Sequence, residues 1–188
     1  MDNGDYQFDH ATIEILDLGT GNGHLLYELN EELLDRSFDK TFKYTGIDYS
    51  PESIAFCQEI VNQKYTPGLF KFEQVDLLMK NQPFLKNKFD IILDKGTLDA
   101  IALNQDPLVD FDNKIGMEVY SSQVKQMMKK NSILLITSCN FTEQELISII
   151  TENGTNDLKV YQKIQYPSFQ FNGVKGSTIC SVSFIKQE

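Results

Sequence analysis

Three glycines and one carboxylate lie close together in the stretch "ILDLGTGNGHLL", residues 15–26. Asp17 sits inside an apolar run, and Gly19, Gly21 and Gly23 follow it at alternate positions. Because glycine has no side chain, such a loop lets a ligand approach the backbone closely. The carboxylate just before the loop favours a ligand that carries positive charge.

Three further aspartates close later apolar runs. Asp48 ends the run in "YTGIDYS", Asp76 follows "FEQV", and Asp94 ends the run in "IILDKGT". In open α/β sheets, ligands bind outside the carboxyl ends of the parallel strands. We therefore expect these carboxylates to converge with the glycine loop at one edge of a sheet.

The loop differs from the phosphate-binding loops that it superficially resembles. A dinucleotide fingerprint needs G-x-G-x-x-G, and His24 occupies the position of its last glycine. A Walker loop needs Gly-Lys-Ser/Thr, which does not follow here. S-adenosylmethionine fits better, because its sulfonium and ammonium groups suit the carboxylates. Asp48 could accept the ribose hydroxyls, Asp76 could accept from the adenine amino group, and Tyr49 could pack on the adenine ring.

Strand and helix patterns alternate along the chain and predict an α/β fold. Apolar runs predict strands over 13–18, 42–47, 69–75, 89–93, 132–137, 158–164 and 179–185. Helical spacing and capping signals predict helices over 22–34, 51–64, 120–130 and from 142 onward. This order predicts a doubly wound, mostly parallel sheet with helices on both faces.

Two segments depart from the alternation. Only the loop "PSFQFNGVKGS" joins the last two strands, so we expect that pair to be antiparallel. Residues 104–118, "NQDPLVDFDNKIGME", form a polar insertion, which we expect to be a mobile loop near the carboxyl edge of the sheet.

Composition limits the classes of function. The 188 residues suit one domain, and the net charge of −10 argues against binding a nucleic acid backbone and favours a cationic partner. No apolar run approaches the roughly 20 residues of a membrane span. The cysteines at 57, 139 and 180 show no metal-binding spacing. We expect a cytoplasmic monomer without a metal or a membrane contact.

Several motifs resemble a known family. "ILDLGTGNG", "YTGIDYS" and "FEQVDLL" resemble the three cofactor motifs of class I, seven-strand S-adenosylmethionine-dependent methyltransferases. "ILDKGTLDAIALN", "LLITSCNFTEQEL" and "PSFQFNGVKGSTICSVSFIKQ" are similar to the lysine methyltransferases of translation elongation factor 1-alpha, in the branch typified by the fungal Efm4-type enzymes. The resemblance spans residues 13–186.

This resemblance carries expectations for fold, cofactor and partner. It implies a Rossmann-like sheet of strand order 3-2-1-4-5-7-6 with strand 7 antiparallel. It implies S-adenosylmethionine as cofactor, S-adenosylhomocysteine as product, and a lysine of elongation factor 1-alpha as substrate. Residues 1–188 would form one methyltransferase domain, with the N-terminal segment of the family short or missing.

The motifs assign the cofactor site residue by residue. The predicted cofactor-binding residues are Asp17, Gly19, Thr20, Gly21, Asn22, Gly23, Asp48, Tyr49, Asp76, Leu77 and Asp94.

The acceptor side is predicted from the chemistry of methyl transfer. The attacking amine must be neutral, whereas a free lysine is protonated at neutral pH, so the site has to desolvate it and hold its hydrogens. Asp94, through its carboxylate or its carbonyl, is the first candidate, with Thr97 and Asn140 positioning the amine. Alternatively, Asp94 only caps the next helix.

Other residues near these motifs receive structural interpretations. We expect Asp99 to be a structural acid, and Lys95 to point away from a cationic cofactor into a salt bridge. Phe169 and Phe171 could line a substrate groove or pack in the core.

Two other functions stay open at this point. One is a small-molecule methyltransferase on the same fold, which would need a closed acceptor pocket. The other is a cofactor-binding partner protein without catalysis. For a protein substrate, we expect the insertion's exposed acids to make the contact: Asp106, Asp110, Asp112 and Glu118.

Overall fold

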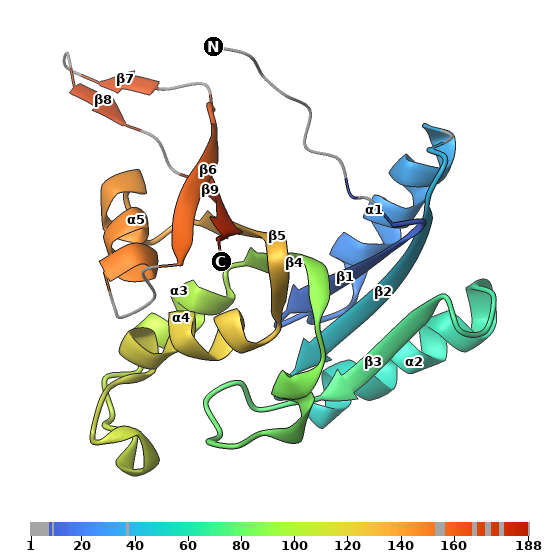
Figure 1. The fold of residues 1–188 in the computed structure, drawn as a ribbon, viewed down its shortest axis with the longest axis horizontal. Helices are drawn as coiled ribbons and strands as arrows, with labels where there is room; N and C mark the ends of the chain where they lie inside the picture. The colour runs from blue at the N-terminus through green and yellow to red at the C-terminus, as the bar shows by residue number, and fades with distance from the viewer. Residues whose placement is uncertain are drawn as a thin grey trace.

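The computed structural model describes residues 8, 10–36, 38–152, 157–166, 169–171, 174–176 and 179–187. A seven-stranded sheet of order β3-β2-β1-β4-β5-β9-β6 runs through the molecule (Figure 1). Its strands are β1 (Thr12–Leu18), β2 (Thr41–Asp48), β3 (Phe70–Gln74), β4 (Phe89–Lys95), β5 (Met128–Ser138), β6 (Leu158–Ile164) and β9 (Cys180–Lys186). The first five pair in parallel, and β9 is antiparallel to β5 and β6. The predicted strand order and the antiparallel strand are confirmed.

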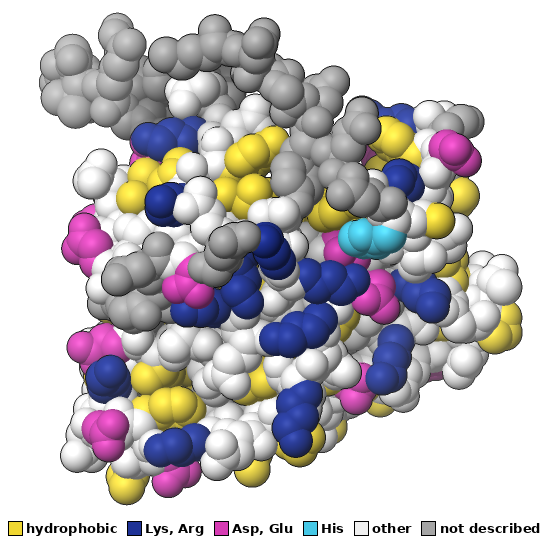
Figure 2. All heavy atoms as spheres, viewed as in Figure 1, with side chains coloured by type: hydrophobic (Ala, Val, Ile, Leu, Met, Phe, Trp, Pro, Cys, Tyr) yellow, Lys and Arg dark blue, Asp and Glu magenta, His cyan; other side chains and the backbone are white. Residues whose placement is uncertain are grey.

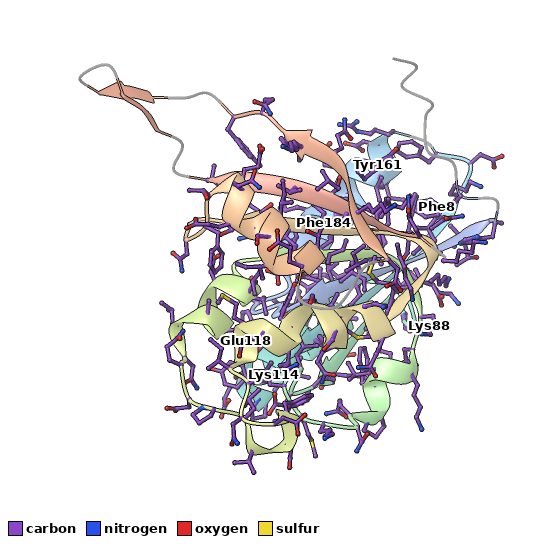
Figure 3. All side chains as sticks on the ribbon, turned by 60° about the vertical axis from the view of Figure 1, so that its left-hand side comes forward. Phe8, Lys88, Lys114, Glu118, Tyr161 and Phe184 are labelled. Carbon is purple, nitrogen blue, oxygen red and sulfur yellow. The ribbon has the colours of Figure 1, made fainter. Side chains whose placement is uncertain are left out.

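Helices cover the two faces of the sheet. On one face lie α1 (His24–Asp35) and α2 (Pro51–Lys64); on the other lie α3 (Thr97–Leu103), α4 (Gly116–Gln126) and α5 (Glu143–Glu152) (Figure 1). The apolar side chains divide into two clusters accordingly. Figure 3 shows Phe184 of β9 beside α5, where it is fully buried. Among the described residues, no helix is long and apolar enough to cross a membrane.

The connection from β3 to β4 contains no α-helix. Its regular structure is one turn of 3-10 helix, η1 (Pro83–Lys86). As a result, the second face of β2 and β3 lacks a covering α-helix: Lys43 and Lys71 are exposed there, whereas Ile47 near the end of β2 is buried. Phe70 and Phe72 are buried under α2, while Lys71 between them is exposed. Parallel sheets are usually covered on both faces, so this area departs from the usual arrangement of a parallel sheet.

The helix predicted over 120–130 is displaced in the structure. α4 begins at Gly116, where the carboxylate of Glu118 accepts a hydrogen bond from the Ile115 N–H at 2.9 Å. Residues from Met128 onward belong to β5. The prediction was wrong at both ends, because isoleucine and glycine are not typical start signals and the apolar residues near 127–128 fit helical spacing as well.

Two connections contain more structure than the sequence indicated. The segment between β6 and β9 includes a two-stranded ribbon of β7 (Phe169–Phe171) and β8 (Val174–Gly176), rather than a plain loop. The side chains of Phe169 and Phe171, expected in a groove or core, lie outside what the structure describes. In the insertion, η2 (Val109–Phe111) is closed by an antiparallel bridge between Leu108 and Lys114.

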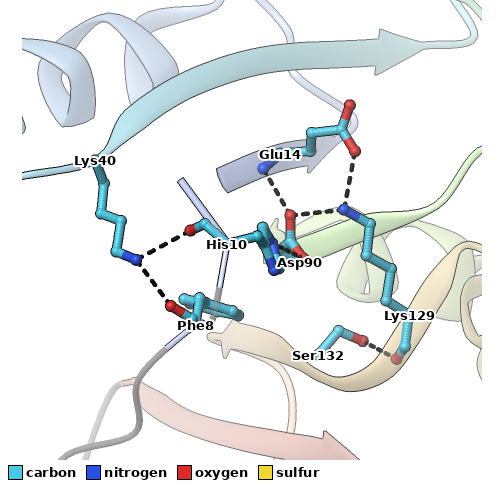
Figure 4. A network of polar contacts seen from close by, with 7 residues as sticks. All are labelled: Phe8, His10, Glu14, Lys40, Asp90, Lys129 and Ser132. Atoms are coloured by element: carbon cyan, nitrogen blue, oxygen red, sulfur yellow. Dashed lines mark hydrogen bonds and ion pairs between the residues drawn. The ribbon is translucent and has the colours of Figure 1, made fainter. Parts of the chain in front are cut away.

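A buried carboxylate joins three strands at the amino edge of the sheet (Figure 4). Asp90 of β4 is 2% exposed, and it accepts from the Glu14 N–H at 2.8 Å and from the Lys129 ammonium at 2.9 Å. His10 Nε2 lies 2.9 Å from the same carboxylate. Lys40 donates to two backbone carbonyls beside it, one of them that of His10. The network ties β1, β4 and β5 to the chain preceding β1.

Candidate active site

The glycine loop leaves β1 and enters α1 at the carboxyl edge of the sheet. Its backbone is held to β2, because the Thr20 N–H donates to the Ile47 carbonyl at 2.9 Å. Gly19 and Gly21 have φ angles of 60° and 55°, which disfavour other residues. A Cβ on Gly19 would lie 2.2 Å from Thr97 Oγ1, whereas a Cβ on Gly21 would meet no atom within 4 Å. Gly19 is therefore required by packing, and Gly21 opens onto free space.

That free space is a pocket of about 540 Å³ over the loop. Five of the predicted cofactor residues line it: Asp17, Gly19, Thr20, Gly21 and Asn22. The pocket continues over the first turns of α1, where His24, Leu25 and Glu28 complete its wall together with Lys95. These four residues were not predicted as part of the site. The 3.6-residue spacing of positions 21, 24, 25 and 28 was the signal that could have found three of them.

Asp48 connects the end of β2 to the glycine loop. It is 8% exposed, and its carboxylate accepts from the Gly21 N–H at 2.9 Å and from the Ser50 N–H at 3.0 Å. Each oxygen keeps a further acceptor position. The residue thus fixes the loop beside the pocket whether or not it also binds a ligand.

The residues predicted around adenine follow β2 and β3 but do not line the pocket. Tyr49 is 78% exposed, and its carbonyl accepts from the Gln74 side chain at 3.1 Å. Asp76 is exposed and accepts from the Leu78 N–H, while Leu77 is buried. The two strand ends are joined, because the Val75 N–H donates to the Asp48 carbonyl at 2.8 Å.

The Asp94 carboxylate is turned into the protein. It is 2% exposed and accepts from the Thr97 N–H at 2.9 Å, from the Leu98 N–H at 3.1 Å and from the Tyr120 hydroxyl at 2.5 Å. The structure thus contains the alternative considered above, in which Asp94 caps the following helix. Two acceptors for the lysine amine were considered at Asp94, its carboxylate and its backbone carbonyl. The carboxylate caps the helix, so the backbone carbonyl is the one that takes no part in capping.

The other two predicted acceptor-site residues differ in their surroundings. The Thr97 hydroxyl donates to the Leu18 carbonyl of β1 at 2.6 Å, so it braces α3 against the glycine loop. Asn140 is exposed just beyond β5, and its N–H donates to Ser138 Oγ at 3.1 Å. Its side-chain amide has no hydrogen bond among the described residues. Asn140 is therefore the predicted acceptor-site side chain that can still bind a ligand.

Asp99 holds the end of β5 in place. Its carboxylate accepts from the Ser138 hydroxyl at 2.5 Å and from the Cys139 N–H at 2.8 Å, and the residue is 8% exposed. The expected structural role of Asp99 is thus observed.

Burial, with a smaller contribution from neighbouring charges, raises the pKa of two of the carboxyl groups. Burial, with the charge of Asp94 adding to it, raises the pKa of Asp17 to about 7, against the lowering effects of Thr20 and Lys95. Burial raises the pKa of Asp94 to about 6, although the hydrogen bond from Tyr120 opposes it. The expectation that Lys95 points away into a salt bridge is wrong: it lines the pocket, and no ion pair involves it in the described part of the chain.

The pocket suits a cationic ligand that packs closely against the backbone of the glycine loop. Asp17 is the buried carboxylate in the pocket wall, and a positive charge beside it would favour its ionised form. The open side of Gly21 admits a ligand against the backbone. Both features match the ammonium-bearing methionine portion of S-adenosylmethionine. Within the described ranges, no group of His, Cys, Asp and Glu side chains is arranged to hold a metal ion.

Comparison with known sequences places the chain among methyltransferases. Residues 9–173 match the family described as "Methyltransferase domain". The protein-lysine N-methyltransferase EFM4 of Saccharomyces cerevisiae is 43% identical over 92% of this chain and 70% of its own length. The protein-lysine N-methyltransferase efm4 of Schizosaccharomyces pombe is 39% identical over 93% of this chain and 70% of its own length. Human EEF1A lysine methyltransferase 2 is 31% identical over 92% of this chain and 65% of its length.

Solved structures support the fold independently. A methyltransferase of Methanosarcina mazei that is dependent on S-adenosylmethionine gives a TM-score of 0.65 at 16% identity, covering 95% of this chain and 94% of that one. A TehB-like S-adenosylmethionine-dependent methyltransferase of Corynebacterium glutamicum gives a TM-score of 0.64 at 16% identity, covering 93% of this chain and 80% of that one.

Proposed function

Since the chain belongs to the Efm4-type family of lysine methyltransferases that act on elongation factor 1-alpha, we propose that it transfers methyl groups from S-adenosylmethionine to a lysine of that factor. The observation that carries the proposal is the pocket over the glycine loop, where the buried Asp17 carboxylate lies beside the open space at Gly21. The choice of substrate is supported by the name of the 31% identical human relative, EEF1A lysine methyltransferase 2.

The cofactor's two ends suit two groups of residues. Asp17 and residues 19–23 would hold the methionine portion, with the Asp17 carboxylate near its ammonium. Asp48 would accept the ribose hydroxyls through its remaining acceptor positions, and Tyr49, Asp76 and Leu77 would surround the adenine. When bound, S-adenosylmethionine supplies a methyl group activated by the positive charge on sulfur.

The protein's own task is to present a neutral lysine amine in line with that methyl group. Burial of the amine lowers its pKa and favours the neutral form. The carbonyl of Asp94 and the side-chain oxygen of Asn140 are the acceptors we assign to its hydrogens. The Asp94 carboxylate and Thr97 would act indirectly, by fixing α3 beside the glycine loop.

The substrate factor would approach over the insertion. Asp106, Asp110, Asp112 and Glu118 are exposed there. Figure 1 places this segment, next to α3 and α4, on the side toward which the arrows of β1 and β2 point. Exposed acids speed the encounter with a basic partner and are screened beyond a Debye length of about 8 Å at physiological salt. The specificity constant should therefore fall with salt, and replacing all four acids with neutral residues should flatten that dependence.

We further propose that residues 1–188 act as one domain and as a monomer in the cytoplasm, without direct contact with nucleic acid or a membrane. The unpaired cysteines fit a reducing compartment. The net charge of −10 opposes approach to a phosphate backbone.

A matched pair of glycine substitutions tests the function. Gly21 and Gly68 both have positive φ and open space at the Cβ position, so leucine strains both backbones alike. Only Gly21 lies in the cofactor pocket. With labelled S-adenosylmethionine and purified elongation factor 1-alpha, we expect Gly21→Leu to abolish methylation and cofactor binding, and Gly68→Leu to keep both. Methylation of small amines with none on the factor would instead establish a small-molecule enzyme, and cofactor binding without any transfer would establish a non-catalytic protein.

A further inference from the structure

The second face of β2 and β3 forms another hollow, separate from the cofactor pocket. It is a groove of about 530 Å³, and the loop around η1 forms one of its walls. Lys43 and Thr45 of β2 project into it beside Lys71 and Glu73 of β3. None of its lining residues belongs to the pocket over the glycine loop. Figure 3 shows Lys88, from the η1 side, well separated from Lys114 and Glu118 of the insertion.

The groove is basic in an acidic protein. Five lysines line it, against two glutamates, although the chain as a whole carries a net charge of −10. The lysines are Lys43, Lys71, Lys86, Lys88 and Lys129. Figure 2 shows dark-blue side chains gathered over the centre of this face, with few acids between them.

Part of this charge is not neutralised within the protein. Lys71 pairs with Glu73 at 2.6 Å, and Lys129 pairs with Glu14 and Asp90. Among the described residues, Lys43 and Lys86 have neither an ion pair nor a hydrogen bond from their ammonium groups, and both are exposed.

The surroundings of Lys88 point the same way. Lys88 donates to the Gln126 carbonyl, which leaves its charge unpaired. The groove therefore keeps at least three lysine charges available to an outside anion.

We propose that this groove binds an acidic segment of a partner polypeptide, independently of the methyl-transfer site. The charges are complementary to aspartate and glutamate side chains. The chemistry fits a peptide better than RNA, because the groove's aromatic residues, Tyr44, Phe84 and Phe89, are buried and offer no stacking surface.

Charge reversal at the two unpaired lysines tests the site. The probe is a fluorescently labelled peptide of ten glutamates, followed by anisotropy at low salt. The Lys43→Glu/Lys86→Glu variant should bind it about tenfold or more weakly, because each reversal replaces an attraction with a repulsion. The matched control is Lys64→Glu/Lys159→Glu. It makes the same change in net charge at two exposed lysines outside the groove, and its affinity should stay within about threefold.

Each alternative result counts against the proposal. Equal loss in both variants would mean that only net charge matters. No binding by the wild type would overturn the proposal, and the lysines would then serve only to prevent an exposed sheet edge from pairing with other chains. Tighter binding of an RNA duplex, with the same sensitivity at Lys43 and Lys86, would make the groove a nucleic acid site. If the glutamate pair unfolds the protein, Lys43→Gln/Lys86→Gln gives the same comparison with a milder change.

Discussion

Asp17 should make cofactor affinity depend on pH. Burial raises the pKa of this carboxyl to about 7 in the ligand-free protein, so near neutrality about half of the molecules carry a protonated Asp17. If the bound ammonium requires the ionised form, the apparent dissociation constant increases as the proton occupies the site. From pH 7.5 to pH 5.5, linkage predicts a loss of affinity of about 25-fold.

The same pKa shift predicts that folding stability changes with pH in the direction opposite to cofactor affinity: affinity rises with pH, whereas the contribution of Asp17 to stability falls. The pKa of Asp17 rises from 3.8 to about 7 on folding, so its contribution to stability is present below pH 4 and is lost as the pH rises through 7. This difference in pKa between the unfolded and the folded state corresponds to at most about 4 kcal/mol of folding free energy. Asp17→Asn removes the ionisable group and with it this pH-dependent loss. The free energy of unfolding of the variant, relative to that of the wild type, should therefore increase from pH 5 to pH 8.

Isothermal titration calorimetry with S-adenosylhomocysteine, which keeps the ammonium, measures the first effect. Asp17→Asn should bind more weakly at pH 7.5 but show a much flatter pH dependence. His24 also lines the pocket, so His24→Gln serves as the control and should keep the wild-type slope. A slope centred near pH 6 that survives in Asp17→Asn would belong to Asp94. An affinity that is independent of pH in the wild type would refute the reasoning.

Three further substitutions test other contacts. Asp48→Ala should weaken cofactor binding by about 2–3 kcal/mol, because charge-assisted hydrogen bonds are lost; an unchanged dissociation constant by calorimetry would exclude Asp48 from the site. Tyr120→Phe should lower the free energy of urea unfolding by about 1–3 kcal/mol, because the buried Asp94 carboxylate loses a donor at 2.5 Å; unchanged stability would contradict the contact. Asp90→Ala should cost about 2 kcal/mol in the same assay, since it breaks a network joining three strands, and a loss below about 0.5 kcal/mol would mean that water replaces it.

The sheet could be predicted from the sequence because its strands are short apolar runs that end in recognisable turns. The carboxyl-edge rule then located the glycine loop and the aspartates without any knowledge of their contacts. The same rule does not reach His24, Leu25 and Glu28, because they lie on α1 beyond the strand ends, and only the helical spacing from Gly21 could have indicated them. Nor could the rule show the open face of β2 and β3. Apolar and polar residues alternate in "FKFEQ", but only the path of the following segment decides whether a helix covers the polar side.

Side-chain direction was the other limit, and Asp94 shows why. An aspartate at a strand end can point toward a ligand or back onto the next helix, and the sequence is the same in both cases. Here the capping contacts at 2.9 and 3.1 Å and the Tyr120 hydroxyl hold it inward. Tyr120 lies 26 residues further along the chain, so no local pattern could have indicated this partner.

The motif "DKGTLDA" therefore has a structural task that is separate from chemistry. Asp94 caps α3, Thr97 on α3 bonds to the end of β1, and Asp99 on the same helix bonds to the end of β5. Through these three contacts, one short helix sets the relative positions of the cofactor loop and of the segment that carries Asn140. A loss of activity on substitution of Asp94 or Thr97 would follow from displacement of α3 as readily as from loss of an acceptor. Asn140 differs, because its side chain supports no described contact, so a fall in kcat without a change in stability or cofactor affinity on Asn140→Ala would report directly on the lysine site.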